Sequence, residues 1–388
     1  MKHLDDMDVS GKRVLLRVDV NVPLGSDGRV DPDEDWRIVA IVPTVRYLLE
    51  HGARVVLIGH LGRPNGTYKG ELTLKPVGEY LERLMSGQEI AFADPWRTDD
   101  VMLPPKAVTL LENVRFDPGE EANAPDFAAK LASFGDVFVN DAFADSHRAH
   151  ASIVGIAPLK PHAAGLLMER EVQTLTKVLK STPRPLVVIV GGAKPGTKLP
   201  LMDSYLRLAD HVLVGGVLAN VFLAFKGLTT GRSVFEEEDR GAMEAHLKNC
   251  DITNTRLHLP VDALVSSQAD GSGPVRMAAV GNVPHDQFIF DIGPDTLELF
   301  ANIIRKAGTV IWNGPMGYYE IPAFRKGTET IAAMIARAPA FSVVGGGDSV
   351  VSLKRLGLIE KIDHVSTGGG AMLEFLAGVP LPGIAALE

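Results

Sequence analysis

The sequence is poor in cysteine, in aromatic side chains and in long hydrophobic runs. Its single cysteine, Cys250, excludes both a disulfide framework within the chain and a metal site built from several cysteines. No apolar run approaches the roughly 18 residues that span a bilayer, so we expect no membrane partner. The first residues, MKHLDDMDVSGKR, lack the apolar stretch of a secretory signal. Together these absences predict a protein of a reducing compartment, located in the cytoplasm.

Basic residues are also fewer than acidic ones, with 39 lysines and arginines against 48 aspartates and glutamates, which gives a formal net charge of -9. Phosphate backbones select basic surfaces, so we expect no nucleic-acid partner. The 46% hydrophobic and 22% charged residues are typical of a soluble globular protein, and 388 residues give room for two or three domains. An acidic total still leaves room for a local basic pocket.

Short apolar runs rich in β-branched residues alternate with segments of helical spacing. In the first half we expect strands at 14–20, 54–60, 108–113 and 136–141, and helices at 38–52, 75–85 and 124–135. In the second half, apolar runs that end in glycines predict strands within 184–192, 210–216, 309–314, 341–347 and 363–370. Strands that alternate with helices predict mostly parallel sheets covered on both faces.

The number of these elements is too large for one sheet. It predicts an α/β fold of two doubly wound, Rossmann-like domains with parallel sheets. The segment 165–180 has helical spacing without strand character, which predicts a linker helix beside a hinge. We place the domains at 1–166 and 167–370, the second beginning with linker helix 167–180.

Ligands of open α/β sheets bind beyond the carboxyl ends of the strands. In the first half, the polar side chains found there are Asp19, Asn21, Arg37, His60, Arg63, Arg115, His147, Arg148 and His150. Each alone is compatible with a surface arginine, a turn former or a core histidine. Because arginine presents a planar fork suited to carboxylate and phosphate, its recurrence at separate strand ends predicts a pocket for a small polyanion.

In the second half, glycines follow the strands instead. They occur in GGAK (191–194), GG (215–216), NGPMG (313–317), GGGDS (345–349) and STGGGA (366–371). Glycine lets a ligand approach the backbone, and helix N-termini supply N–H donors, so the set predicts a nucleotide site. Any single pair of glycines is compatible with a tight turn, and none of these loops has the pattern GxxxxGK[ST] or GxGxxG. Asp348 and Ser349 suit Mg²⁺ and phosphate, or a helix cap.

The two halves together predict a phosphotransferase for a small acidic metabolite. The sequence resembles the phosphoglycerate kinase family over nearly its whole length. The matching stretches, in order, are RVDVNVPL, HLGRP, LLENVRFDPGEE, GDVFVNDAF, HRAHAS, GGAK, WNGPMGYYE, GGGDS and HVSTGGGA. The resemblance implies Mg²⁺-dependent, reversible phosphoryl transfer from 1,3-bisphosphoglycerate to ADP, giving ATP and 3-phosphoglycerate, through domain closure.

The resemblance also implies the organisation of the molecule and the roles of single residues. It implies a monomer with 3-phosphoglycerate in domain 1–166, the nucleotide in domain 167–370, and segment 371–388 folded back on the first domain. The implied 3-phosphoglycerate ligands are Asp19, Asn21, Arg37, His60, Arg63, Arg115 and Arg148. The implied nucleotide ligands are Lys194, Lys198, Gly215, Asn313, Pro315, Glu320, Gly345, Gly346, Gly347, Asp348 and Ser349, with Asp348 on the metal. The implied catalytic residues are Arg37, Lys194, Gly346 and Gly369.

Three positions depart from the family pattern. Thr197 stands where an acidic residue is usual, Val217 where a third glycine is common, and Asp145 adds negative charge beside the expected anion pocket. The altered loop 195–197 supports one alternative, a catalytically weak relative that acts as a binding protein. A second alternative, a nicotinamide-dependent dehydrogenase, requires GxGxxG after the first strand, and RVDVNVPLGSDG does not contain it.

Overall fold

The computed structural model describes residues 1–96, 103–233, 241 and 256–388. The chain forms two compact units, Met1–Thr174 with Val379–Glu388, and Leu175–Gly378. The division falls inside helix α5 (Leu166–Ser181), whereas the sequence predicted it before residue 167. The single cysteine, Cys250, lies outside the described residues.

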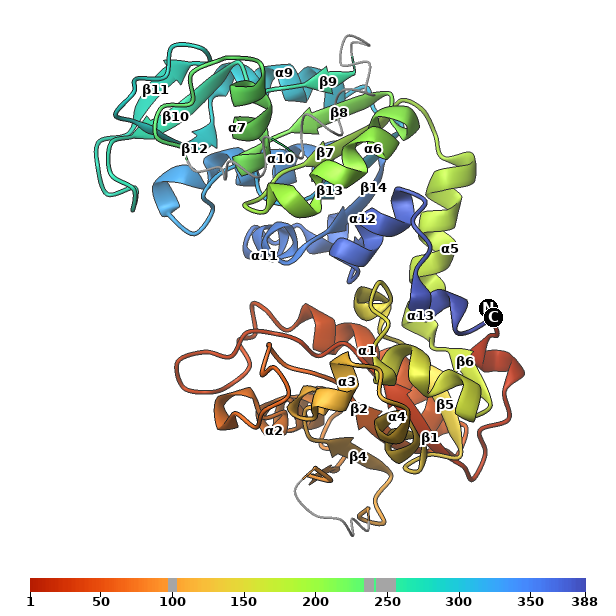
Figure 1. The fold of residues 1–388 in the computed structure, drawn as a ribbon. Helices are drawn as coiled ribbons and strands as arrows, with labels where there is room; N and C mark the ends of the chain where they lie inside the picture. Colours follow the sequence, from red (N-terminus) through yellow and green to blue (C-terminus); the bar gives the residue numbers. More distant parts are fainter. Residues whose placement is uncertain (97–102, 234–240, 242–255) are drawn as a thin grey trace. The chain divides into compact units, whose positions relative to one another are not determined.

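The first unit is built on a six-stranded parallel sheet with the order β3-β4-β2-β1-β5-β6. Its strands are β1 (Arg13–Arg17), β2 (Arg54–Ile58), β3 (Ile90–Ala93), β4 (Val108–Leu111), β5 (Val137–Asn140) and β6 (His162–Ala164). Its helices include α1 (Trp36–Glu50), α2 (Lys75–Leu84), α3 (Pro118–Glu121) and α4 (Pro125–Ala132). Figure 1 shows the strands between these helices.

Alternate residues of the strands pack on opposite faces of this sheet. Val14 and Leu16 join the core formed with α1 and α2, whereas Leu15 joins the core formed with α4. Because side chains of a strand point alternately to its two faces, a sheet covered on both sides needs the continuous apolar runs seen in the sequence. The α/β prediction is confirmed for this unit.

The four predicted strands of the first half are present, and two further strands were missed. The predicted runs 14–20, 54–60 and 108–113 extend beyond the observed strands because their last residues form loops at the sheet edge. The missed β3 and β6 are the outer strands, with four and three residues, and β3 is only half-buried. Short edge strands lack the buried run on which the prediction relied.

The second unit contains another six-stranded parallel sheet, with the order β15-β14-β13-β7-β8-β9. Its strands are β7 (Leu186–Val190), β8 (His211–Val214), β9 (Leu257–His258), β13 (Thr309–Asn313), β14 (Phe341–Gly345) and β15 (His364–Ser366). The helices α9 (Pro294–Ile304), α10 (Lys326–Arg337) and α11 (Gly347–Arg355) share one core with these strands. The other helices named below are α6 (Met202–Leu208), α7 (Gly216–Phe225) and α12 (Gly370–Leu376). All five strands predicted for this half are present.

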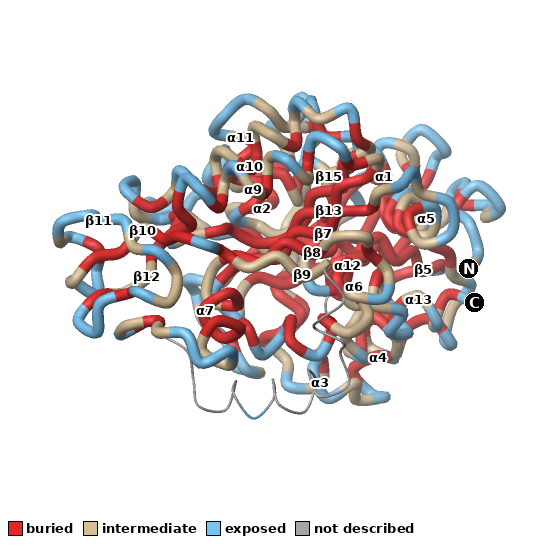
Figure 2. The backbone as a smooth tube through the Cα atoms, turned by 90° about the horizontal axis from the view of Figure 1, so that it is seen from above, coloured by how far each residue is buried: buried red, intermediate tan, exposed pale blue. Residues whose placement is uncertain are grey.

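The second unit also carries an antiparallel sheet that the sequence did not predict. Its strands, in the order β11-β10-β12, are β10 (Asp262–Ser266), β11 (Arg276–Ala279) and β12 (Phe288–Ile292). Figure 2 shows β13, β7 and β8 as buried tubes, whereas β11 is largely exposed. A strand with little burial leaves no apolar run in the sequence, which explains the omission.

Both ends of the chain lie in the first unit, and Figure 1 marks them side by side. The backbone N–H of Lys2 donates to the carbonyl of Leu387 at 3.0 Å, and that of Gly383, in α13 (Pro382–Ala385), donates to Ser146 at 2.8 Å. Within the expected returning segment 371–388, the first unit takes residues 379–388, while α12 stays with the second unit. Backbone hydrogen bonds therefore anchor the last ten residues in the unit that contains the first ones.

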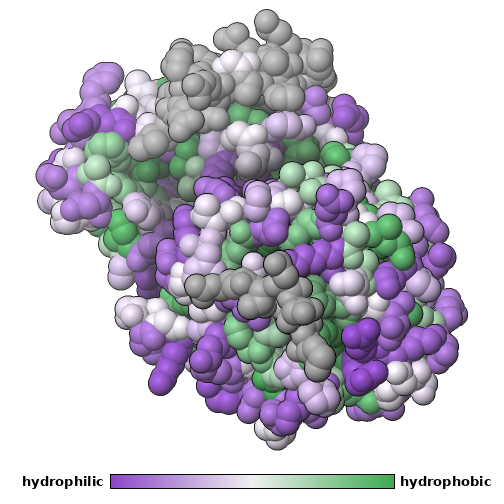
Figure 3. All heavy atoms as spheres, turned by 60° about the horizontal axis from the view of Figure 1, so that its bottom comes forward, coloured by the Kyte–Doolittle hydropathy of each residue, from purple (hydrophilic) through white to green (hydrophobic). Residues whose placement is uncertain are grey.

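The helices that the structure describes include none with both the length and the apolar character required to cross a bilayer. The face drawn in Figure 3 mixes hydrophilic and hydrophobic side chains.

Candidate functional site

In the first unit, the loops that follow the carboxyl ends of the strands are tied together by hydrogen bonds. The sheet reverses its winding at β1, which lies between β2 and β5, and such a switch point is where open α/β sheets bind ligands. The side-chain oxygen of Asn21 accepts from the backbone N–H of Gly62 at 2.9 Å, which joins the loop after β1 to the loop after β2. Arg115, after β4, donates from Nη1 to the Gly62 carbonyl at 3.0 Å.

Four cationic or titratable side chains surround one buried carboxylate, and we call this set the Asp145 cluster. Oδ2 of Asp145 lies 3.0 Å from Arg17 Nη2 and 3.3 Å from His60 Nδ1. Oδ1 lies 3.7 Å from Arg115 Nη2 and 3.9 Å from Arg148 Nε. Asp145 is 4% exposed; burial alone raises the pKa of its carboxyl, but His60, Arg17 and Arg115 hold that pKa well below its ordinary value. Asp145 is therefore an ionised group at neutral pH.

Arg115 keeps buried N–H groups that no described residue accepts. The side chain is 2% exposed, and its Nε and Nη2 make no hydrogen bond among the described residues. Nε lies 3.5 Å from a carboxylate oxygen of Glu121, which is close enough for attraction between charges. An unsatisfied buried donor costs about 1–3 kcal/mol, so these two groups are suited to an additional, anionic acceptor.

The remaining predicted ligands of the first unit lie on the same edge. Arg37, near the start of α1, forms an ion pair with Asp19, and its guanidinium lies 4.8 Å from the centre of the Trp36 ring. Asp19 also accepts from the backbone N–H of Asn21 at 3.0 Å. Arg63 is exposed on the loop after β2. The structure thus brings Asp19, Asn21 and Arg37 into direct contact and leaves Arg63 at the surface.

The two histidines of this edge with displaced pKa values are neutral at pH 7. Burial, opposed by Asp145, lowers the pKa of His60, and burial with the nearby Arg115 lowers the pKa of His150 to about 4. His147 accepts a hydrogen bond from Nε of Arg148 at 3.3 Å. The positive charge of the Asp145 cluster therefore comes from its arginines.

Sequence reasoning missed Arg17, which is fully buried in β1. Its Nε donates to the hydroxyl of Ser152 at 2.8 Å, and Ser152 donates in turn to Glu120 at 2.6 Å. Burial raises the pKa of the Glu120 carboxyl. A signal was present in the sequence, because an arginine inside the apolar run VLLRV must find a buried partner.

Asp19, His60 and Asp145 also form the one group of three possible metal ligands found among the described residues, with ligand atoms within 4.8 Å of one another. Asp19 is paired with Arg37, and Asp145 with Arg17. Guanidinium groups thus supply the positive charge that a metal ion would bring, so this trio does not fit a divalent cation.

In the second unit, the glycine turns after β7 and β13 face each other at the corresponding switch point. The N–H of Gly191 donates to the carbonyl of Asn313 at 2.9 Å, and that of Gly192 donates to Pro315 at 2.7 Å. A Cβ on Gly191 would overlap the Pro315 carbonyl. Close approach of two backbones therefore requires this glycine, whether or not a ligand is bound.

A cavity of about 440 Å³ opens beside these turns. Part of its wall is apolar, made by Val217 and Leu223 of α7 and by Phe288, Phe290 and Ile292 of β12. Of the predicted nucleotide ligands, Pro315, Glu320 and Asp348 line it. An apolar cavity with a few polar groups is typical of a site for a small molecule or cofactor. Because the sequence did not reveal β12, the aromatic wall was missed as well.

The two lysines of the first glycine turn have different surroundings. Lys198 is 9% exposed, and its ammonium donates to the Gly191 carbonyl. Burial, opposed by Asp348, lowers the pKa of Lys198 to about 8. Lys194 is exposed, and its carbonyl accepts from the hydroxyl of Thr197 at 3.0 Å. The unusual Thr197 therefore stabilises the short turn Pro195–Thr197.

Asp348 and Glu320 are two carboxylates on the cavity wall. Desolvation and then the neighbouring Glu320 raise the pKa of Asp348, while Lys198 and Lys194 oppose the shift. Oxygen ligands suit Mg²⁺, and a cation would relieve the repulsion between these two groups. The residues present therefore fit a magnesium ion at Asp348.

Other predicted residues of the second unit hold the turns together. Ser349 Oγ accepts from the N–H of Gly314 at 2.9 Å, and the side-chain amide of Asn313 donates to Gly369 at 3.4 Å. Gly346 (φ 93°) directly precedes α11, which begins at Gly347. The contacts seen here are structural, and the roles of these positions as ligands stay predictions.

Two of the predicted glycines are explained by packing. A Cβ on Gly345 would lie 2.8 Å from the sulfur of Met372, and one on Gly215 would lie 2.7 Å from that of Met316. Gly369 (φ 49°) caps α12, and a Cβ there would meet nothing within 4 Å. Its backbone conformation, which glycine favours, is the constraint at that position.

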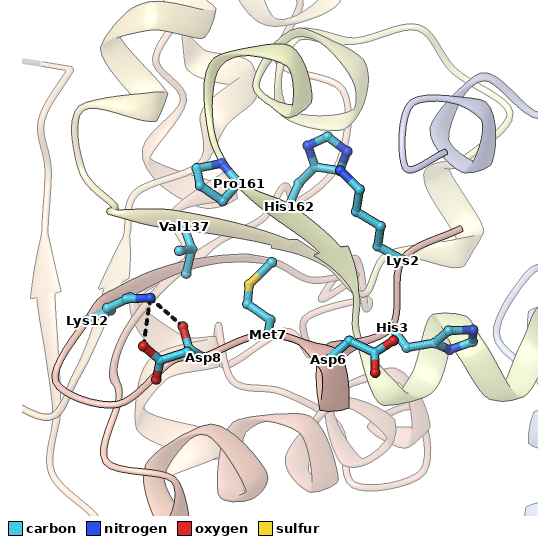
Figure 4. Close-up of a pocket in the computed structure, with 9 residues that line it drawn as sticks. All are labelled: Lys2, His3, Asp6, Met7, Asp8, Lys12, Val137, Pro161 and His162. Carbon is cyan, nitrogen blue, oxygen red and sulfur yellow. Dashed lines mark hydrogen bonds and ion pairs between the residues drawn. The ribbon is translucent and has the colours of Figure 1, made fainter.

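A second cavity, of about 330 Å³, lies at the amino ends of β1, β5 and β6 in the first unit. Figure 4 shows Val137 and His162, the first residues of β5 and β6, with Lys12 just before β1. Lys12 is already paired with Asp8, at 3.1 Å from its carboxylate. The Asp145 cluster follows the carboxyl ends of the strands, so this cavity lies at the opposite edge of the sheet and is a separate site.

Comparison with known proteins identifies the family to which the chain belongs. The sequence model of the family described as "Phosphoglycerate kinase" matches residues 4–379. The chain belongs to the phosphoglycerate kinase family. The resemblance inferred from the sequence is thereby confirmed, as is the prediction of a phosphotransferase, and the dehydrogenase alternative is not supported.

The relatives match over their full lengths. A phosphoglycerate kinase of Thermomicrobium roseum is 46% identical over 392 residues, covering 100% of this chain and 99% of the relative. One of Moorella thermoacetica is 44% identical, covering 99% and 98%. The crystal structure of the phosphoglycerate kinase of Pyrococcus horikoshii OT3 has a TM-score of 0.87 at 36% identity, covering 100% of this chain and 98% of that one. The structure of the phosphoglycerate kinase of Coxiella burnetii has a TM-score of 0.81 at 37% identity, with 99% and 98% covered.

Proposed function

We propose that this protein catalyses the reversible, Mg²⁺-dependent transfer of a phosphoryl group from 1,3-bisphosphoglycerate to ADP, giving ATP and 3-phosphoglycerate. Membership of the family and full-length relatives that carry this name support the proposal. The structural observation that carries it is the buried guanidinium of Arg115, whose Nε and Nη2 have no acceptor among the described residues. A carboxylate or phosphate oxygen is the acceptor that fits such donors best.

In the first unit, 3-phosphoglycerate is held by guanidinium groups and loop side chains. Arg115 and Arg148 bind its anionic groups, with His60 and Arg63 beside them and Asn21 holding the loop after β2. Arg37 stabilises the transferring group, and Asp19 orients the guanidinium of Arg37 through their ion pair. Charged groups that are already held in place stabilise the transition state without having to move during the reaction.

In the second unit, the nucleotide occupies the cavity beside α7 and β12, with Glu320 at the ribose and Pro315 at the wall. Asp348 would hold Mg²⁺, which when bound neutralises charge on the nucleotide phosphates. Lys198 pairs with those phosphates, and Lys194 meets the transferred group. Backbone N–H groups at Gly346, Gly347 and Gly369 donate to phosphate oxygens.

The chemistry requires positioning and charge neutralisation, without a general base. The acceptor carboxylate of 3-phosphoglycerate is ionised at neutral pH, so no proton must be removed before transfer. Transfer does require the two ligands to meet, and we therefore keep domain closure as part of the proposal. We also propose that the protein is a monomer in the cytoplasm that binds these small molecules and no nucleic acid.

A coupled assay tests the proposal directly. Purified protein with ATP, Mg²⁺ and 3-phosphoglycerate should generate 1,3-bisphosphoglycerate, detected through NADH oxidation by an added glyceraldehyde-3-phosphate dehydrogenase. Omitting any one of the three components, or adding excess EDTA, should abolish the signal. Binding of both substrates without turnover would instead support the alternative of a catalytically weak binding protein.

A further inference from the structure

The Asp145 cluster contains a negative charge where the proposed function requires a site for a negative substrate. Asp145 contacts Arg17, His60, Arg115 and Arg148 within 3.9 Å, and its carboxyl is buried and ionised. Of the other acidic groups nearby, Asp19 is paired with Arg37 and Glu120 accepts from Ser152. Glu121 lies 3.5 Å from Nε of Arg115, but it is more exposed than Asp145 and its charge is better screened by solvent. Asp145 is thus the one carboxylate, among the described residues, that contacts three arginines.

The contacts of Asp145 fall into two groups. Arg17 is fully buried and donates to Asp145 at 3.0 Å and to Ser152 at 2.8 Å, so its hydrogen bonds stabilise the protein itself and are not offered to a ligand. Arg115 and Arg148 lie 3.7 and 3.9 Å away, beyond hydrogen-bond distance. They interact with Asp145 through charge. Nε of Arg148 donates to His147 and Nη1 of Arg115 donates to Gly62, whereas Nη2 of Arg115 has no hydrogen-bond acceptor among the described residues and is available to a ligand.

We propose that Asp145 is a resident counter-anion that weakens the binding of anions by Arg115 and Arg148 and so sets the affinity for 3-phosphoglycerate. This inference rests on the proposed function for the identity of the substrate. An anion bound at these two arginines lies within a few ångströms of Asp145, where like charges repel strongly in a poorly hydrated site. Asp145 also cancels part of the arginine charge that attracts the ligand.

The same carboxylate stabilises the protein without ligand. Arg17 has no exposed surface, and removing the charge of its partner leaves a buried guanidinium uncompensated. Neutralising Asp145 should therefore have opposite effects, lowering the stability of the ligand-free protein while tightening anion binding. A residue that only positions the arginines would weaken both properties when changed.

Asp145→Asn tests this, with Asp136→Asn as a matched control. Asp136 directly precedes β5, at the amino end of the sheet, and its replacement makes the same charge change away from the cluster. Calorimetric titration with 3-phosphoglycerate and with sodium sulfate, and thermal unfolding with and without each, are measured for the full chain. In Asp145→Asn we expect a lower Tm without ligand, affinities on the order of tenfold tighter for both anions, and a larger rise in Tm on adding them.

The control should resemble the unchanged protein, and the affinity for ATP should be the same in all three. Equal or weaker binding of both anions by Asp145→Asn would overturn the inference. If Asp145→Asn does not fold, Asp145→Ser is measured instead, because it also removes the charge and leaves a smaller polar side chain. The sulfate comparison decides the inference even if the coupled assay shows no phosphoryl transfer, so its failure is distinct from failure of the proposed function.

Discussion

At the scale of single residues, the arginines of the first unit differ in burial and in the contacts that they make with other residues. Arg17 is fully buried and donates hydrogen bonds to Asp145 and Ser152, whereas the side chain of Arg148 is 31% exposed, donates to His147 and lies 3.9 Å from Asp145. A substitution at Arg148 therefore removes charge for the substrate while disturbing little of the fold.

We expect Arg148→Ala to raise the KM for 3-phosphoglycerate by roughly 10- to 100-fold while changing kcat by only a few-fold. The reason is that Arg148 binds parts of the substrate whose charge does not change during transfer. Steady-state kinetics measure both constants, with the exposed Arg29→Ala as control. A fall in kcat at constant KM would assign Arg148 to the moving group instead.

Lys194→Ala should have the opposite kinetic signature. Because Lys194 is proposed to meet the transferred phosphoryl group, its loss should lower kcat by about 10²–10³ and leave the KM for 3-phosphoglycerate nearly unchanged. Lys226→Ala, an exposed lysine after α7, serves as control in the same assay. An increase in that KM with normal turnover would mean that the two units have been assigned to the wrong substrates.

Lys198 should make nucleotide binding depend on pH. Its pKa is lowered to about 8, so its ammonium loses a proton, and with it the attraction for phosphate, as the pH rises through 8. We expect the affinity for ATP to fall several-fold between pH 7 and pH 9, measured by calorimetry. Lys198→Arg stays charged and should lose this dependence, and an unchanged slope in Lys198→Arg would exclude Lys198 as its source.

The same shift has a defined sign for folding stability. The folded-state pKa lies below the ordinary lysine value of about 10.4, so the unfolded chain binds more protons between pH 8 and pH 10. The contribution of Lys198 to the free energy of unfolding therefore rises with pH in that window.

At the scale of elements, the start of α7 shows why the strand ends of the second unit are rich in glycine. Gly216 has φ 60°, and a Cβ there would lie 2.6 Å from the nitrogen of Gly192. Both the backbone conformation and the neighbouring turn thus exclude a side chain.

Gly216→Ala should destabilise the second unit by about 3 kcal/mol or more, because it combines an unfavourable φ with a clash. Gly227→Ala isolates the first effect, since Gly227 has φ 76° and a Cβ there meets nothing within 4 Å; about 1 kcal/mol is expected. Hydrogen exchange of β7 and α7 in the full chain measures both. Equal losses would show that the contact with Gly192 relaxes.

Elements differed in how well the sequence predicted them. The central strands β1, β2, β7 and β13 are buried along most of their length, so their apolar runs were visible. The antiparallel sheet and the outer strands β3, β6 and β9 were missed because pairing and edge position, which depend on distant residues, determine them.

At the scale of the whole molecule, the last ten residues complete the first unit. Leu381 and Leu387 are buried there, and the carbonyl of Leu387 accepts from Lys2. The chain therefore leaves the first unit, forms the second, and returns.

Removing residues 379–388 should destabilise the first unit by about 3–6 kcal/mol, since each buried leucine contributes roughly 1.5–3 kcal/mol. Hydrogen exchange should increase in β5 and β6 while β13 and β14 keep their protection. Deletion of Glu388 alone, which is exposed, is the control. Equal protection in the truncated and full chains would show that the first unit is stable without its C-terminal residues.

The sequence by itself determined the α/β class, the central strands and most of the polar side chains at the strand ends, because burial on both faces of a sheet demands continuous apolar runs and leaves function to the loops after the strands. Only the tertiary structure decided which of those side chains meet. Arg17 and Asp145 are 128 positions apart in the chain and pair at 3.0 Å, and of the two lysines in GGAKPGTK only Lys198 is buried against the turn. Such contacts depend on strand order and loop closure. The run VLLRV indicates that Arg17 needs a buried partner, but the local sequence does not say which distant residue that partner is.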